Sequence, residues 1–139
     1  MIDKNRVLEF IKKQSLCVLS TVTPDNKSES AVMAYSVMDD LTMIMNTEPT
    51  TRKFENIVNN PNVSIIVGGL ENPSLQIEAM ATIAQGGREE ELKGFALQQH
   101  PELKDYLSET GRFVEIKPYW VRWSNFDQNP VEIEEMDLR

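Results

Sequence analysis

Short runs rich in β-branched and apolar residues recur along the chain, and turn signals separate them. The first two runs are joined by Pro-Asp-Asn-Lys at 24–27, which predicts a hairpin. Consecutive strands with short connections favour a small barrel, because a closed sheet leaves no exposed edge. The sequence therefore predicts a mainly β fold, a β-barrel with helical additions. The expected strands cover residues 16–23, 28–38, 41–47, 63–69, 75–84, 112–118 and 119–126.

Three segments have helical patterns instead. Residues 3–14 are amphipathic and begin at Asp3, a plausible cap. A second helix begins at Thr51 and stops at Asn59-Asn60-Pro61, because proline disfavours helical geometry in the residue before it. The third helix is predicted over 86–100, with its acids at 89–91 on a solvated face near the helix start.

Length and charge exclude several classes of function. The 139 residues suit one domain, 1–139, in which the acidic tail at 127–139 is expected to form a C-terminal surface arm. There are 22 acidic and 14 basic residues, a net charge of -8, and no basic stripe, which argues against nucleic-acid binding. The apolar runs are strand-sized, which argues against a membrane span. A single cysteine, Cys17, agrees with a cytoplasmic location, and one Cys with one His argues against a protein-built zinc site.

The start of the second helix carries an unusual pair of cations. Helix starts favour acids, because their unpaired backbone N–H groups make that end partly positive. Here Thr50 and Thr51 are followed by Arg52 and Lys53. Hydroxyls, free N–H groups and two cations in one small volume suit a phosphate. The spacing equally allows a simpler alternative, in which the two cations are solvated and pair with Glu48 or Glu55.

Methionines are the second unusual feature. Thioethers are adaptable, so they can line a flat aromatic ligand, or they can simply fill an irregular core. Asn46 and Thr47 end the third predicted strand just before the cationic turn, where they can contact a ligand ring or cap the loop. The clustered methionines are Met33, Met38, Met43 and Met45, with Met80 in the fifth strand.

Other candidate residues carry weaker signals. Trp120 and Trp123 lie on opposite faces of the last strand, so at most one points into the barrel. Cys17 is expected to be a buried structural thiol, since no histidine is paired with it. His100 precedes a proline and has no identifiable partner, so a Ser-His-Asp hydrolase is poorly supported.

Three segments together resemble a known family. The run N-T-E-P-T-T-R-K-F-E-N-I-V-N-N-P-N-V-S-I-I-V at 46–67 is similar to the FMN-binding split-barrel proteins related to pyridoxamine 5′-phosphate oxidase. The hairpin at 17–33 resembles their opening strands. Q-I-E-A-M-A-T-I at 76–83 resembles their fifth strand, with Ala79 where glycine is usual. The resemblance covers roughly residues 5–126.

The resemblance implies a six- to seven-stranded antiparallel split barrel that forms a homodimer with FMN at the subunit interface. In that family the hydroxyl-Arg-Lys element holds the FMN phosphate, the polar pair lies against the ribityl chain and ring, and the second strand runs beside the isoalloxazine. Carried onto this sequence, the cofactor-binding residues are Val32, Met33, Ala34, Asn46, Thr47, Thr51, Arg52 and Lys53, with Ser74 and Gln76 from the partner subunit and Trp120 flanking the site.

Some family positions do not match. The pyridoxine-phosphate oxidases carry basic residues on the second strand, where this chain has Ala31 and Ser36, and their C-terminal Arg-x-His element is missing. We therefore expect a general member of the superfamily, an oxidoreductase that is flavin reductase-like or stress-associated, with an unidentified substrate and NAD(P)H as a possible reductant. The alternatives are a non-catalytic flavin-binding or storage module, and the same barrel binding heme or a deazaflavin. Heme is disfavoured because His100 is the only histidine.

Overall fold

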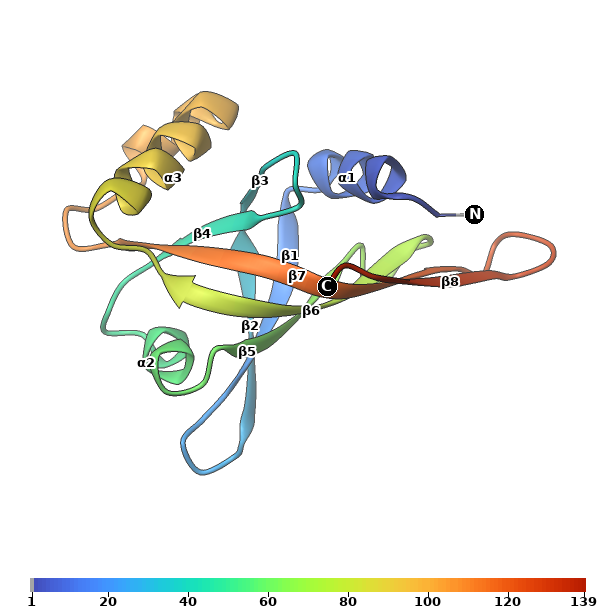
Figure 1. Cartoon of the computed structure of the whole chain (residues 1–139), viewed down its shortest axis with the longest axis horizontal. Helices are drawn as coiled ribbons and strands as arrows, with labels where there is room; N and C mark the ends of the chain where they lie inside the picture. Colours follow the sequence, from blue (N-terminus) through green and yellow to red (C-terminus); the bar gives the residue numbers. More distant parts are fainter. Residues whose placement is uncertain (1) are drawn as a thin grey trace.

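The computed structural model describes residues 2–139, which form one curled antiparallel sheet and three α-helices (Figure 1). In the view of Figure 1, α1 and α3 lie on the upper side of the sheet and α2 on the lower side. No helix in the described part of the chain is long and apolar enough to cross a membrane. The elements are α1 (Lys4–Lys13), β1 (Leu16–Val22), β2 (Ser28–Ala34), β3 (Ser36–Val37), β4 (Met43–Thr47), α2 (Arg52–Asn59), β5 (Asn62–Val67), β6 (Ser74–Ile83), α3 (Gly86–Gln99), the 3₁₀-helix η1 (Pro101–Asp105), β7 (Arg112–Asn125) and β8 (Glu132–Asp137).

The strand order explains the barrel shape. Neighbouring strands follow the order β2-β1-β5-β6-β7-β4-β3, and β8 pairs with β7. The two ends of this order, β2 and β3, are consecutive in sequence and are separated only by Tyr35. The sheet must therefore curl until its ends meet. The prediction of a mainly β split barrel is confirmed.

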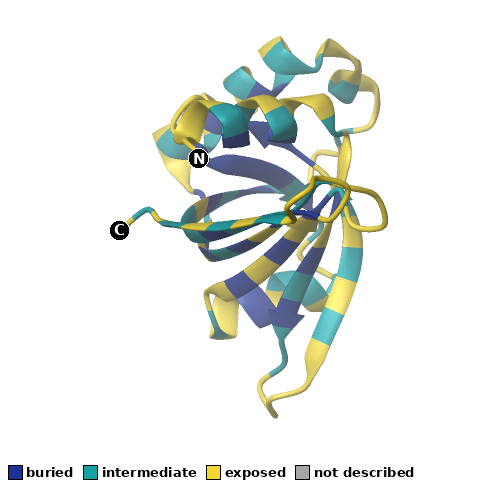
Figure 2. Cartoon of the chain, turned by 90° about the vertical axis from the view of Figure 1, so that its right-hand side faces the viewer, coloured by how far each residue is buried: buried dark blue, intermediate teal, exposed yellow. Residues whose placement is uncertain are grey.

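The interior of the curled sheet is the main hydrophobic core. Alternate residues along β5 and β6 point inward, and Ile65 and Ile77 are fully buried (Figure 2). The α1 helix covers this core with Val7 and Ile11, and α2 adds Ile57. Burying a side chain of this size contributes about 1.5–3 kcal/mol, so the shared core is what holds the helices against the sheet.

A smaller second core lies between α3 and the sheet. Leu92 and Ala96 of α3 pack against Ile44 of β4 and Phe113 of β7. Leu103 of η1 and the following Leu107 are packed against the same cluster. This second core fixes α3 and η1 beside β4, where they form one wall of a pocket.

Two features of the predicted strands differ from the structure. The strand predicted over 28–38 is interrupted at Tyr35, because its phenol turns to donate to the main-chain oxygen of Ile11 over 2.6 Å. The strands predicted over 112–118 and 119–126 are one strand, β7, with an irregularity where the register jumps from Trp120 to Pro118.

The tail at 127–139, predicted as a surface arm, contains strand β8. The first part of β7 pairs with β4, over Arg112 to Ile116, but β7 continues well past the end of β4. That continuation leaves a free edge over Trp120 to Asn125, which β8 occupies. The burial of β8 alternates between half-buried and exposed, so the tail lies on the surface as an edge strand.

Candidate functional site

The Thr51 hydroxyl caps the start of α2. Its oxygen accepts a hydrogen bond from the Phe54 N–H over 3.3 Å and donates to the Glu48 carbonyl over 2.9 Å. The Thr47 hydroxyl lies 3.0 Å from the same oxygen. Since a hydroxyl carries one hydrogen, Thr47 donates and Thr51 accepts between them. Thr51 therefore fixes the helix start and ties it to the end of β4.

Arg52 is already paired in the structure. Its guanidinium donates to the Glu29 carboxylate of β2 over 2.7 Å, although the side chain is 86% exposed. The partner is neither Glu48 nor Glu55, the two acids that the sequence suggested. Glu48 instead accepts from the Ser108 and Thr110 hydroxyls. Lys53 makes no ion pair within residues 2–139.

Sequence reasoning missed Glu29 and the buried pair behind it. The Asn56 amide donates to Glu29 over 2.9 Å and to the Thr21 hydroxyl over 3.0 Å, and both Asn56 and Thr21 are buried. The Asn56 hydrogen bond, together with Arg52, lowers the pKa of Glu29 below its usual value. One available signal was parity, since Glu29 shares a strand face with Ala31 and Met33.

These side chains line a cavity of about 390 Å³ between β1, β2 and the start of α2. Arg52 and Lys53 supply two cations. The first N–H groups of a helix have no intrahelical acceptor, so they add donors at the same place. The arrangement suits an anion that accepts several hydrogen bonds, such as a phosphate. The lining residues are Leu19, Thr21, Glu29, Ser30, Ala31, Thr51, Arg52 and Lys53, and we call this space the anion cavity.

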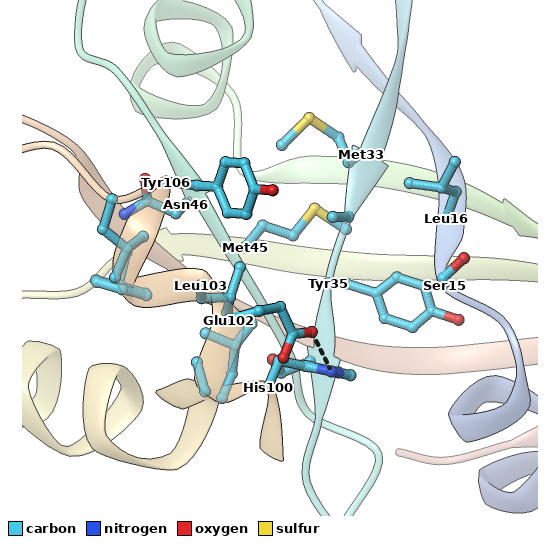
Figure 3. Close-up of a pocket in the computed structure, with 16 residues that line it drawn as sticks. Ser15, Leu16, Met33, Tyr35, Met45, Asn46, His100, Glu102, Leu103 and Tyr106 are labelled. Atoms are coloured by element: carbon cyan, nitrogen blue, oxygen red, sulfur yellow. Dashed lines mark ion pairs between the residues drawn. The ribbon is translucent and has the colours of Figure 1, made fainter. Parts of the chain in front are cut away.

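A second space, of about 360 Å³, is mainly apolar (Figure 3). Met33 of β2 and Met45 of β4 face it from the sheet, and Leu103 and Tyr106 close it from the side of η1 (Figure 3). Phe113 and Ala96 of the second core also line it. We call this space the apolar pocket.

Several polar side chains line the apolar pocket, and Ser36, Asn46, His100 and Glu102 are the ones that bear on ligand binding. His100 lies 3.5 Å from the Glu102 carboxylate through its Nδ1 atom. The Asn46 amide lies against Gly111 and makes no hydrogen bond within the described residues. The Ser36 hydroxyl is buried, and its oxygen has no hydrogen-bond partner in residues 2–139.

The anion cavity and the apolar pocket are neighbours along β2. Ala31 lines the first and Met33 lines the second. Alternate residues of a strand point the same way and are about 7 Å apart. A ligand with an anionic tail and a flat ring can therefore lie along β2 and reach both spaces.

Seven of the eleven predicted cofactor-binding residues lie at or between the two spaces, and four lie elsewhere. Met33, Ala34 and Asn46 line the apolar pocket, and Thr51, Arg52 and Lys53 line the anion cavity. Thr47 joins the two regions through its hydrogen bond to Thr51. The remaining four residues, Val32, Ser74, Gln76 and Trp120, lie away from both spaces, on the outer face of the sheet.

Residues across that outer face form aligned rows. Val32, Val18 and Ile66 are direct neighbours on β2, β1 and β5, and all three are exposed. Gln76 follows Ile66 on β6, in the same row. A contiguous exposed apolar row with a polar edge is typical of a surface that binds another protein.

Burial shows where the two tryptophans and Cys17, the weaker candidates from the sequence, lie in the fold. Trp123 is in the main core and Trp120 is on the outer face, as the parity argument predicted. Burial raises the pKa of the Cys17 thiol to about 12, which agrees with a structural thiol. Among residues 2–139 no cluster of three or more His, Cys, Asp or Glu side chains is arranged to hold a metal ion.

Comparisons with known proteins identify the fold and the family. No curated protein matches the sequence. Among solved structures, general stress protein 26 from Bacillus anthracis str. Sterne is 24% identical with a TM-score of 0.69, and the match covers 97% of this chain and 98% of that one. HutZ, the heme storage protein from Vibrio cholerae, is 17% identical with a TM-score of 0.69, covering 85% and 91%.

A heme binding protein from Mycobacterium smegmatis is 12% identical with a TM-score of 0.76, and the match covers 92% of this chain but 55% of that one. This chain thus spans little more than half of the mycobacterial protein. At these identities the three likenesses show a shared fold. The model of the family described as pyridoxamine 5'-phosphate oxidase matches residues 4–122, from α1 well into β7. The chain therefore belongs to the pyridoxamine 5'-phosphate oxidase family.

Proposed function

We propose that this protein binds FMN and acts as an oxidoreductase on a substrate other than a vitamin phosphate. The observation that supports this most is the position of the anion cavity and the apolar pocket side by side along β2. FMN has the matching shape, with a phosphate at one end and a flat ring at the other. When bound, it supplies the hydride chemistry, and the protein supplies binding and orientation.

The anion cavity holds the phosphate in this proposal. Lys53 is without an ion-pair partner in the described residues, so its charge is available at once. Arg52 must exchange Glu29 for the phosphate or contact both, and its high exposure allows that movement. The Thr51 hydroxyl already donates its hydrogen to the Glu48 carbonyl, so we assign it the role of holding the first N–H groups of α2 in place.

The edge of β2 and the mouth of the apolar pocket receive the ring, and the inner part of the pocket is left open. Within residues 2–139, β2 pairs with β1 alone, so the backbone groups along its other edge are available to a ligand. Val32, Met33 and Ala34 contribute this edge. The Asn46 amide, which makes no hydrogen bond in the described structure, can donate to or accept from a polar ring atom.

The proposal includes a homodimer. The apolar row of Val32, Val18 and Ile66 lies on the reverse face of the strands that line the anion cavity. A second copy seated on this row buries it, and Ser74, Gln76 and Trp120, which share that outer face, then lie at or near the interface. Those residues lie on the outer face, where they cannot reach the spaces of their own chain directly.

The cofactor proposal is tested with the purified protein. We expect a yellow protein that releases FMN on heating, and FMN fluorescence that is quenched on titration. The double variant R52A/K53A should bind FMN at least tenfold more weakly, since each charge-assisted hydrogen bond contributes about 1.5–3 kcal/mol. Binding of riboflavin, which lacks the phosphate, should not change. Lys13→Ala, an exposed cation at the end of α1, is the control.

A colourless protein that neither quenches FMN nor binds it in calorimetry would contradict the proposal. Oxidation of NADH or NADPH by the FMN-loaded protein separates an enzyme from a storage module, which binds FMN without turnover. The absorption spectrum separates FMN from a deazaflavin.

The homodimer is tested by light scattering after size exclusion. Val32→Asp places a charge in the apolar row and should give monomers. Val58→Asp on α2 is a matched control, because Val32 and Val58 are 66% and 63% exposed and Val58 lies on a different surface. A wild-type protein that is monomeric at high concentration would rule out the dimer.

Heme is a second candidate ligand. His100 lies at the apolar pocket with Met33 and Met45 (Figure 3), and His and Met side chains are heme axial ligands. Two of the similar structures are a heme binding and a heme storage protein. Titration with hemin should then give a Soret band that shifts in His100→Ala, and an unshifted band would exclude His100 as the ligand.

A further inference from the structure

We propose that the inner part of the apolar pocket binds a neutral ring compound with one polar group, and that it rejects phosphorylated and carboxylated molecules. That this compound is the substrate rests on the proposed function, whereas the binding itself requires no flavin. The inference depends on the wall of the pocket, on the Ser36 hydroxyl and on the charges around the space.

The wall comes from two independent parts of the fold. Met33 and Met45 belong to the barrel, and Leu103 and Leu107 belong to the helical layer packed on the second core. Thioether and leucine side chains adapt to flat apolar ligands. The volume of about 360 Å³ is within the range of about 300–1,000 Å³ found for small-molecule sites.

The Ser36 hydroxyl marks where the polar group of the ligand lies. Ser36 is 2% exposed, lines the pocket, and has an oxygen without a partner in residues 2–139. Leaving a buried hydroxyl unpaired is unfavourable, because the group has lost its hydrogen bonds to water without replacing them. The neighbouring Tyr35 phenol does not donate to it, because its hydrogen points to the carbonyls of Ile11 and Gln14. A ligand hydroxyl or carbonyl that reaches Ser36 removes this cost.

The charges around the pocket exclude an anionic ligand. The lining contains no lysine or arginine, its acidic residue is Glu102 at the rim, and its histidine, His100, already faces that carboxylate over 3.5 Å. A phosphate or carboxylate entering the pocket loses its water without gaining a counter-charge, which is strongly unfavourable. The cations Arg52 and Lys53 line the neighbouring anion cavity instead. The molecule thus separates an anion-binding space from a space for neutral ligands.

Three compounds of the same size test this inference. They are 2-naphthol, which is neutral with one hydroxyl, 2-naphthoate, which is anionic, and naphthalene, which has no polar group. Each is titrated into protein labelled with ¹³C at its methionine methyl groups, first as purified and then with FMN added. The signals of Met33 and Met45 report on the pocket, and that of Met80, which is exposed on β6, is the internal control.

We expect 2-naphthol to shift the Met33 and Met45 signals and to bind at least tenfold more tightly than 2-naphthoate. Ser36→Ala should weaken the binding of 2-naphthol about fivefold and leave the binding of naphthalene unchanged, because only the hydroxyl contact is lost. Unchanged naphthalene binding also shows that this variant keeps the pocket intact. Ser64→Ala, an exposed serine on β5, should change neither compound. Glu102→Lys at the rim should raise the affinity for 2-naphthoate.

Any of three results would overturn the inference. The first is equal affinity of the wild type for 2-naphthol and 2-naphthoate. The second is a set of shifts that spares Met33 and Met45. The third is complete displacement of 2-naphthol by FMN, which assigns the pocket to the flavin ring. A protein that binds 2-naphthol at this pocket but never binds FMN contradicts the proposed function and leaves the neutral-ligand site standing.

Discussion

The Arg52 guanidinium donates to the Glu29 carboxylate over 2.7 Å, so an acid from β2 faces a cation at the start of α2. Asn56 holds the other carboxylate oxygen over 2.9 Å, which prevents Glu29 from turning away. The site therefore contains an anion of its own. A phosphate entering the anion cavity must compete with Glu29 for Arg52.

Glu29→Gln should tighten FMN binding. The substitution removes the competing charge but keeps an oxygen that can accept from Asn56. An exposed ion pair contributes up to about 1 kcal/mol, so the dissociation constant should fall by up to about fivefold. FMN fluorescence titration measures it. Glu55→Gln removes an exposed acid from α2, the helix that carries Arg52, and should have no comparable effect. Weaker binding in Glu29→Gln would show that Glu29 assists the phosphate rather than competing with it.

Thr51→Ala should both destabilise the protein and weaken its binding of FMN. The variant loses the cap to Phe54 and the link to Thr47, and loss of a helix cap costs about 1 kcal/mol. Thermal denaturation should show a lower melting temperature. Thr51→Ser keeps the hydroxyl and should restore both properties. If Thr51→Ser fails to restore FMN binding, the threonine methyl group is what matters.

The contact of Glu132 with Arg6 and Trp123 should make stability depend on pH. The two terminal guanidinium nitrogens of Arg6 and the Trp123 indole N–H donate to this carboxylate, and they lower its pKa below the usual value of 4.5. A lowered folded-state pKa stabilises the fold above about pH 4.5, and the contribution is lost as pH falls through the folded pKa. Glu132→Gln should therefore melt earlier than the wild type at pH 7.

The difference between the two melting temperatures should be smaller at pH 3 than at pH 7, because the contribution of the Glu132 charge diminishes as pH falls from 4.5 toward the lowered folded-state pKa. Glu9→Gln, an exposed acid on α1, should match the wild type at both pH values. A difference of the same size at pH 7 and pH 3 would mean that Glu132 acts through packing rather than through its charge.

Substitution by alanine should have opposite effects on stability at two glycines. Gly68 has φ of +92°, and a Cβ there lies 2.7 Å from the Pro73 carbonyl oxygen, so Gly68→Ala should destabilise by more than about 1 kcal/mol. Gly94 lies in the exposed middle of α3 with open space around it, so Gly94→Ala should stabilise by about 0.5–1 kcal/mol. Urea denaturation measures both, and equal effects would contradict the backbone argument.

The sequence determined the order of the elements and the cationic turn. β-branched runs with turn signals predict strands, and the Asn-Pro stop ends α2 where it was expected, since these are local preferences of the backbone. Thr51, Arg52 and Lys53 are adjacent, so their meeting at one helix start also follows from local geometry. Strand β8 was not predicted, because its formation depends on the free edge of the longer β7 and not on its own acidic sequence.

Only the tertiary structure decided the partners of those residues. Glu29 and Arg52 are 23 positions apart, and the curl of the sheet brings them together. The same is true of Ser36, Met45 and His100, which meet only because α3 and η1 pack on the second core. Local patterns predict strands and helix starts from neighbouring residues. Charge partners and pockets depend on long-range packing, which is set by how the sheet closes.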